Sequence, residues 1–170
     1  IFRDPRWGRG HETYGEDPYL TGKLGCAYIR GLQGPDRDHP KAAACAKHFA
    51  VHSGPEALRH EFDAKVSRHD LYDTYLYAFK RCVKDAGVEA VMGAYNRVNG
   101  EPACGSRTLL KNILRDEFGF EGHVVSDCWA INDFHLHHHV TGIAEESAAM
   151  AVNNGCDLNC GTAFLHLKEA

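Results

Sequence analysis

The sequence alternates short apolar runs with longer segments of helical periodicity, and this alternation limits the fold more than any other feature. The apolar runs at 41–51, 88–95, 123–127 and 156–160 each have the length and composition of one buried strand. Segments with helical spacing lie between them, joined by short loops. Strands separated in this way pair in parallel through right-handed crossovers. The alternation therefore predicts an α/β fold with a parallel sheet.

Start and stop signals mark the helices between these runs. Asp17 followed by Pro18 predicts an N-cap with proline at the first helical position. Ser67 and Asp70 have the spacing of a capping box at the start of the next helix. Further helices are expected from Ser106 onward and over 145–155. The glycines that end helical patterns are Gly31, Gly34, Gly87 and Gly119.

About four strand–helix units fit into the 170 residues of the chain. A complete (β/α)8 barrel needs roughly 250 residues, so we predict a partial TIM-type barrel with parallel strands, about half of the whole. Strands that are apolar on both faces fit a sheet covered by helices. The alternative is a small doubly wound sheet. It is disfavoured because no glycine-rich nucleotide-binding turn follows any strand.

The composition and the two ends of the chain limit the classes of partner that we expect. The net charge is −4 and there is no basic stripe, which argues against nucleic acid. No apolar run approaches the roughly 20 residues of a membrane span. Because the chain opens on Ile1 in an arginine-rich pattern and ends on "LHLKEA", we expect a piece of a longer protein. Its compartment, cytoplasmic or secreted, stays unassigned.

Seven cysteines occur without a C-x-x-C pair, and most lie inside apolar stretches. This pattern predicts buried free thiols in a reducing compartment. Pairing or metal binding by Cys156 and Cys160 is the weaker alternative, since their spacing alone indicates little.

Polar residues stand where three of the predicted strands end. Asp127 ends one strand, Lys47 and His48 lie in "AKHF", and Tyr95 and Asn96 lie in "GAYN". The carboxyl ends of parallel strands meet at one edge of the sheet, which is where barrel enzymes have their active sites. We therefore expect these side chains to lie on the same side of the sheet.

The residue types at this edge suit a sugar. A carboxylate at a rigid strand end can attack an anomeric carbon and form a covalent glycosyl-enzyme. Basic side chains donate hydrogen bonds to sugar hydroxyls, and an arginine can bind a hydroxyl pair with its fork. A tyrosine can hydrogen-bond the carboxylate, and a tryptophan offers a flat wall to a pyranose face. The residues expected in these roles around Asp127 are Arg9, Lys47, His48, Tyr95 and Trp129.

The sequence resembles the catalytic barrel of glycoside hydrolase family 3. The matching segments follow the order of the family and cover nearly the whole chain. They are "RDPRWGRGHETYGEDP" (3–18), "AACAKHFAV" (43–51), "VMGAYNRVNGEP" (91–102), "FGFEGHVVSDCWA" (118–130) and "NNGCDLNCG" (153–161). The resemblance implies that residues 1–170 are a fragment of the N-terminal barrel domain, truncated at both ends.

The resemblance also implies an activity. It implies a retaining exo-β-glycosidase that hydrolyses terminal non-reducing β-D-xylosyl or β-D-glucosyl residues through a covalent glycosyl-aspartate. Asp127 would be the nucleophile. The sugar next to the cleaved bond would be bound by Arg9, Lys47 and His48, with Met92 and Tyr95 beside them.

No cofactor and no metal ion is implied by the resemblance. The expected partners are an oligosaccharide or an aryl or alkyl β-glycoside, and a C-terminal domain that carries the acid/base. Without that domain the fragment alone is expected to be inactive. Glu12 and Glu16 are expected to be ion-paired scaffold, and Glu56 either reaches the substrate or pairs with Arg59.

Two alternative functions remain. One branch of the family, the β-N-acetylhexosaminidases, carries an Asp-Ser-His acid/base on the loop after K-H-F. Here His60 falls near that histidine, but Leu58 and Arg59 replace the other two residues. The second alternative is a non-catalytic sugar- or metal-binding module. The histidines of "DFHLHHHV" (133–140) suggest a metal site, although a solvated loop is the expectation for them.

Overall fold

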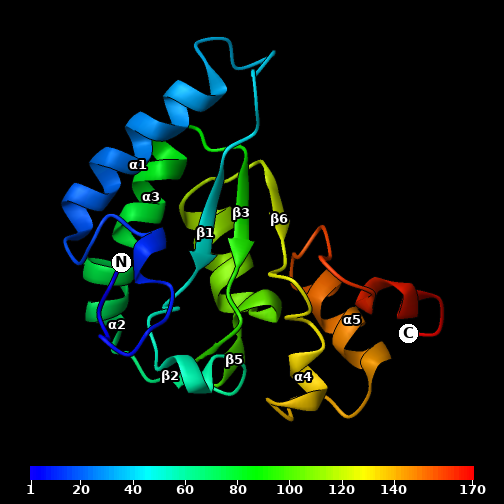
Figure 1. Ribbon diagram of the computed structural model, residues 1–170. Helices are drawn as coiled ribbons and strands as arrows, with labels where there is room; N and C mark the ends of the chain where they lie inside the picture. The colour runs from blue at the N-terminus through cyan, green and yellow to red at the C-terminus, as the bar shows by residue number, and fades with distance from the viewer.

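A parallel three-stranded sheet forms the centre of the computed structural model, which describes residues 1–170 (Figure 1). Its strands are β1 (Cys45–Phe49), β3 (Ala90–Gly93) and β6 (His123–Val125), in the order β1-β3-β6. In the register, Ala46 lies opposite Val91, which lies opposite Val124. The predicted α/β class with parallel strands is confirmed. The sheet is an open part of a (β/α)8-type barrel.

The first helix begins and ends as its sequence signals indicate. In α1 (Pro18–Gln33), the side chain of Asp17 accepts a hydrogen bond of 2.8 Å from the backbone N–H of Leu20. This bond satisfies one of the free N–H groups at the helix start. Gly34 follows the helix with φ +83°, a conformation that glycine adopts without steric cost.

The second and third helical segments contain π-helical turns, which the sequence pattern does not predict. The second comprises α2 (Arg68–Asp70), η3 (Leu71–Tyr75) and α3 (Tyr77–Lys84), and η3 is π-helical. Its cap is confirmed, because the N–H of Asp70 donates to Ser67 Oγ at 3.1 Å. The third is the π-helical η5 (Thr108–Glu117), which packs behind the sheet in Figure 1.

The remaining elements are short. The helical ones are η1 (Gly10–Glu12), η2 (Glu56–Leu58), η4 (Ala103–Gly105), α4 (Asp133–Leu136), α5 (Ala144–Asn153) and η6 (Ala163–Lys168). None of the helices has the length and apolar character that crossing a membrane requires.

The predicted fourth strand at 156–160 is reduced to a single parallel bridge between Val125 and Leu158. The side chain of Asp157 explains the difference. Its carboxylate accepts from the backbone N–H of Val124 at 2.7 Å, where a strand would place a carbonyl, and it also binds Arg115 at 2.8 Å. The segment nevertheless lies beside β6, and its course matters for the site.

A small second sheet lies past the carboxyl ends of the main strands (Figure 1). It consists of β2 (Asp63–Ala64), β4 (Arg97–Val98) and β5 (Glu101–Pro102), in the order β2-β4-β5. Residues 99 and 100 join β4 to β5, with φ +51° at Asn99 and +96° at Gly100. This is the Asn-Gly turn that two-residue hairpins favour.

One apolar core joins the sheet to the helices that cover it. Phe49, Val91 and Val124 are fully buried in the strands, and Leu110 and Leu114 of η5 are fully buried against them. The outer face of α1 is different, because it exposes an apolar stripe. Its members are Tyr19, Leu20, Leu24, Tyr28 and Leu32.

Replacement of a core leucine tests this packing. Leu110 is 0% exposed and Leu165 is 74% exposed, so they form a matched pair. We expect Leu110→Ala to lower the free energy of unfolding by about 2–5 kcal/mol, because it removes buried surface and leaves a cavity. Leu165→Ala should change it by less than about 0.5 kcal/mol. Urea titrations of both variants check this, and equal losses would contradict the core described above.

Candidate active site

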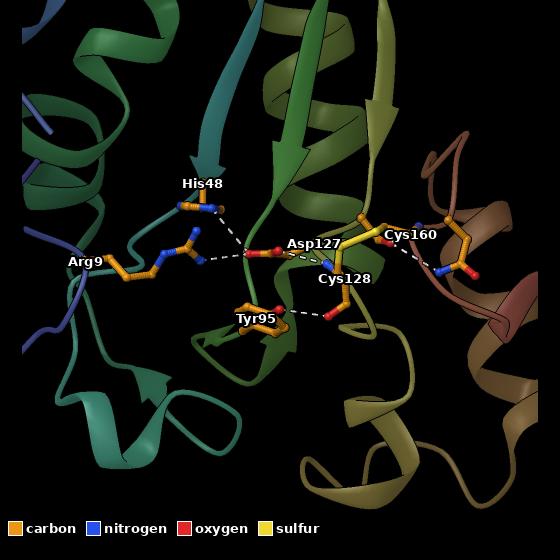
Figure 2. Close-up of a disulfide and its surroundings, with 8 residues drawn as sticks. Arg9, His48, Tyr95, Asp127, Cys128 and Cys160 are labelled. Atoms are coloured by element: carbon orange, nitrogen blue, oxygen red, sulfur yellow. Dashed lines mark hydrogen bonds and ion pairs between the residues drawn. A yellow bond between two sulfur atoms is a disulfide. The ribbon is translucent and has the colours of Figure 1, made fainter. Parts of the chain in front are cut away.

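Asp127 lies two residues beyond β6, at the carboxyl edge of the sheet, and is 6% exposed (Figure 2). Both carboxylate oxygens have partners. The backbone N–H of Cys128 donates to Oδ1 at 2.8 Å, and Nη1 of Arg9 donates to Oδ2 at 3.2 Å. A buried carboxylate is stable only with such partners. The pair also connects two segments that lie 118 positions apart in the sequence.

Glu12 binds two cations, Arg9 and Lys47, and so orients the arginine that contacts Asp127. Its carboxylate accepts from Nε of Arg9 at 2.8 Å and from Nη2 at 3.0 Å, and it binds Nζ of Lys47 at 2.6 Å. The hydrogen bonds from Arg9 and then from Lys47 lower the pKa of Glu12 to about 2. The expected scaffold role of Glu12 is confirmed. Glu16 is exposed and forms no ion pair, so the same expectation for it is wrong.

His48, at the end of β1, faces Asp127 as a neutral ring. Its Nε2 lies 3.3 Å from Oδ2 of Asp127, but burial, followed by the charges of neighbouring groups, lowers the pKa of His48 to about 2. The short distance is therefore not an ion pair, and Nε2 has no hydrogen-bond partner in the protein. A buried ring nitrogen without a partner is costly. A hydroxyl group that approaches His48 and Asp127 together would give this nitrogen a partner.

A second layer supports His48. The ring of His52 lies 4.9 Å from that of His48, and its Nδ1 lies 3.1 Å from Oδ1 of Asn96. The amide of Asn96 in turn donates to the carbonyl of Ala50 at 3.2 Å. Burial lowers the pKa of His52 to about 4. The strand-end position of Asn96 is confirmed, and its function there is to hold His52.

Tyr95 lies below Asp127 in Figure 2. The sequence predicts a hydrogen bond from Tyr95 to the carboxylate itself. Its hydroxyl donates to the backbone carbonyl of Cys128 at 2.8 Å, and its interaction with the carboxylate contributes to its raised pKa. Burial, then the charge of Asp127, raises the pKa of Tyr95 to about 12. Tyr95 is thus a neutral donor that fixes the residue next to Asp127.

The other predicted residues form no hydrogen bond or ion pair with the carboxylate. Lys47 is paired with Glu12. Met92 is half-buried in β3, three positions before Tyr95. Trp129 is exposed, and a side-chain carbon added at Gly161 would lie 3.3 Å from its indole ring. The structure therefore brings Arg9, His48, Tyr95 and Asp127 together, with Lys47 joined to them through Glu12.

The cysteine prediction is partly wrong, because Cys128 and Cys160 form a disulfide. The bridge between Val125 and Leu158 sets the two segments side by side, which leaves the Cα atoms of the two cysteines 4.4 Å apart. The suggested pairing of Cys160 with Cys156 is also wrong. Four of the remaining cysteines are buried free thiols, and Cys45 is exposed.

The expectation of a solvated loop for residues 133–140 is wrong in part, because His137 and His139 are exposed but α4 and the buried His138 are not a solvated loop. His138 is 4% exposed, its ring stacks on that of Phe134, and its backbone N–H donates to the carbonyl of Asp133. Asp133 is buried, which raises its pKa, and its Oδ2 lies 2.8 Å from Nδ1 of His60. The ring of His60 packs edge-on against Tyr95 at 4.8 Å. The missed pair His60–Asp133 therefore borders the site.

Glu56 takes the structural one of its two expected roles. It forms an ion pair with Arg59 and accepts from the backbone N–H of Gly8 at 3.0 Å. The guanidinium of Arg59 also lies over the ring of Tyr95, 5.9 Å from its centre. Glu56 therefore anchors the N-terminal loop that carries Arg9.

Two groups bring three possible metal ligands close together. One comprises Glu145, His166 and Glu169 at the surface, and the other comprises His48, His52 and Asp127. In the second group the guanidinium of Arg9 already lies against Asp127. A cation there would meet a like charge, so the group suits uncharged hydroxyls better than a metal ion.

Comparisons with known proteins agree with this geometry. The family model described as "Glycosyl hydrolase family 3 N terminal domain" matches residues 1–163. A "Xylan 1,4-beta-xylosidase" of Xylanibacter ruminicola is 54% identical over 174 residues, covering 100% of this chain and 20% of that protein. A "Probable exo-1,4-beta-xylosidase bxlB" of Aspergillus clavatus is 49% identical, over 99% of this chain and 23% of that protein.

Solved structures of the family have lower identity but very similar folds. One titled "GH3 exo-beta-xylosidase (XlnD) in complex with xylobiose aziridine activity based probe" has a TM-score of 0.96 at 36% identity, covering 99% of this chain and 23% of that one. A β-glucosidase of Listeria innocua in complex with isofagomine has a TM-score of 0.89 at 36% identity, over 99% of this chain and 24% of that one. The chain thus spans about a fifth to a quarter of the proteins that it matches.

The buried histidines make stability depend on pH. Burial lowers the pKa to about 2 for His48 and to about 4 for His52 and His138, against about 6.5 in the unfolded chain. Below pH 6.5 the unfolded state therefore binds more protons. The contribution of these histidines to stability should be constant above that pH and fall between pH 6.5 and 4, by up to about 1.4 kcal/mol per pH unit for each histidine.

Urea unfolding at several pH values checks this dependence. His138→Phe should reduce the slope below pH 6.5 by about one proton. The matched control is His39→Gln, because that side chain is 84% exposed and should leave the slope unchanged. Identical slopes for the two variants would show that His138 is not held neutral.

Proposed function

The chain belongs to glycosyl hydrolase family 3, and on that premise we propose that it carries the nucleophile and sugar site of a retaining exo-β-glycosidase. The substrate class is a β-glycoside with a terminal non-reducing xylosyl residue, and β-glucosides are the second candidate. One observation carries the proposal. Asp127 is a buried strand-end carboxylate with Oδ1 held by a backbone N–H, while Oδ2 faces Arg9 and His48.

The proposed first step is attack by Oδ2 of Asp127 on the anomeric carbon. The bond from that carbon to the leaving oxygen breaks, and a proton donor protonates the oxygen. Water then attacks the same carbon and gives a proton to the group that had served as proton donor, while the bond to Oδ2 of Asp127 breaks and the sugar is released. Arg9 supports this cycle, because its guanidinium lies against the oxygen that gains and loses the bond.

The unpaired groups around Asp127 suit sugar hydroxyls. Nε2 of His48 is buried and unpaired, and it lies on the side of the carboxylate that also holds Arg9. A ring hydroxyl bound there would replace a costly unpaired nitrogen with a hydrogen bond. Lys47 lies on the same strand as His48 and is a further hydrogen-bond donor. Its Nζ is held by Glu12.

The preference for xylosides rests on the relatives. The curated proteins at 54% and 49% identity are named as xylosidases. The solved xylosidase and the solved β-glucosidase are both 36% identical, with TM-scores of 0.96 and 0.89. The two sugars differ by one hydroxymethyl group, which one side chain can select for or against. The alternative of a β-N-acetylhexosaminidase gains less support, since His60 is paired with Asp133 from another segment.

We propose that the acid/base lies outside residues 1–170. A retaining enzyme needs a second carboxyl group roughly 5–5.5 Å from the nucleophile. Glu12 is a poor proton donor because two cations hold its pKa at about 2, and Glu56 is paired with Arg59. The exposed apolar stripe of α1 and the open sheet are consistent with a barrel domain that continues beyond this segment.

Substitution in the full-length protein tests the proposal. Asp127→Ala should lower kcat on an aryl β-xyloside by several orders of magnitude, because it removes the covalent step and not merely binding. Azide should partly restore turnover and yield the inverted glycosyl azide. Asp116→Ala is the matched control, since Asp116 is an exposed aspartate on η5.

Two results would contradict this account. Near-normal hydrolysis by Asp127→Ala would remove Asp127 from the chemistry. Faster hydrolysis of an aryl β-glucoside than of the xyloside by the unmodified enzyme would keep the mechanism and reverse the proposed sugar preference.

A further inference from the structure

We propose that the disulfide between Cys128 and Cys160 is a positioning element of the active site. In this account it holds Asp127 and Tyr95 in the reacting arrangement, and its reduction lowers turnover while the fold remains intact. The inference rests on the proposed function, because it assigns a role to the disulfide in the same reaction.

The disulfide is attached directly to the nucleophile segment. Cys128 follows Asp127 in the chain, and Cys160 lies on the neighbouring segment, beyond the bridge between Val125 and Leu158. In Figure 2 the sulfur–sulfur bond lies next to the carboxylate, on the side away from Arg9 and His48. The guanidinium of Arg9 and the disulfide thus hold Asp127 from two sides.

The backbone of Cys128 contacts both functional side chains. Its N–H donates to Oδ1 of Asp127 at 2.8 Å, and its carbonyl accepts from the hydroxyl of Tyr95 at 2.8 Å. A shift of this one residue therefore moves the carboxylate and the tyrosine together. A misplacement of about 1 Å at a reacting group can lower a rate on the order of 100-fold.

The turn after Asp127 needs to be held in place. Trp129 has φ +67°, a region that bulky residues other than glycine rarely occupy. Its backbone N–H donates to the carbonyl of Cys160 at 2.7 Å. The turn is therefore joined to Cys160 twice, by this hydrogen bond and by the disulfide from Cys128. Opening the disulfide would allow this unfavourable conformation to relax.

Hydrogen bonds would keep the two segments near one another after reduction. Oγ of Ser126 accepts from the backbone N–H of Cys160 at 3.0 Å and from the amide of Asn159 at 3.2 Å, and the N–H of Ser126 donates to the carbonyl of Leu158. The apolar core is built from other residues. Reduction should therefore loosen the site without unfolding the domain.

Reduction is chemically accessible, because Cys128 is exposed and Cys160 is half-buried. A dithiol is the reductant. One of its thiolates attacks one sulfur, and the other cysteine sulfur leaves as a thiolate. The second thiolate of the reductant then displaces the mixed disulfide and forms a cyclic disulfide. Two electrons and two protons thereby convert the bond into two cysteine thiols.

The experiment uses the full-length enzyme with and without a dithiol, and the double variant Cys128→Ser/Cys160→Ser. Mass spectrometry of alkylated peptides confirms the state of the two cysteines. The kcat and KM for an aryl β-xyloside and the thermal midpoint are then measured. We expect kcat to fall on the order of 10- to 100-fold, with a much smaller change in KM and a midpoint still above the assay temperature. Reoxidation should restore kcat in the unmodified enzyme.

The matched control is Cys45→Ser, since Cys45 is an exposed cysteine outside the disulfide. It should leave kcat, and the response of kcat to the dithiol, unchanged. An unchanged kcat after complete reduction would overturn the inference. Loss of turnover together with unfolding would also overturn it, because the bond would then be a structural staple.

One further outcome separates this inference from the proposed function. If the oxidised enzyme hydrolyses neither the xyloside nor the glucoside, the proposed function fails and the inference fails with it. If the oxidised enzyme is active and reduction has no effect, the inference alone fails.

Discussion

The contact between Arg9 and Asp127 is the interaction on which the site depends. It joins the first loop of the chain to the third strand of the sheet, and it sets a positive charge beside a buried carboxylate. Removal of Arg9 would leave the buried carboxylate of Asp127 without a charged partner, which costs far more than the pair gains. Glu12 fixes the arginine from the other side, so the geometry of Oδ2 is determined before a substrate arrives.

The fold supports this contact because it brings the ends of three strands to one edge of the sheet and links the loops that follow these strands. His48 leaves β1, Tyr95 follows β3, and Asp127 follows β6. The backbone of Cys128 holds both Asp127 and Tyr95, and His52 packs against His48. The ionisation states of His48 and Tyr95 follow from burial. His48 stays neutral and Tyr95 stays protonated, which leaves Arg9 as the charge that acts on the carboxylate.

The features predicted from sequence were those encoded by short segments. The N-cap at Asp17 and the strand ends at Asp127 and Tyr95 depend on neighbouring residues, and the structure places them as expected. The disulfide, the His60–Asp133 pair and the burial of His138 depend on segments that meet only in the folded chain. No local pattern indicates them. The hairpin at residues 99 and 100 had a usable signal, the Asn-Gly pair, but its strands are too short to show periodicity.

The most direct test of the central claim is to trap the covalent intermediate on the full-length enzyme. An activated 2-deoxy-2-fluoro-β-xyloside slows the second step of a retaining mechanism more than the first, so the glycosyl-enzyme accumulates. Digestion and mass spectrometry then identify the modified residue. The account predicts one added fluoroxylosyl group on Asp127, within the peptide that contains "HVVSDCWA". A label on a different carboxyl group, such as Asp133 or Glu12, would contradict it.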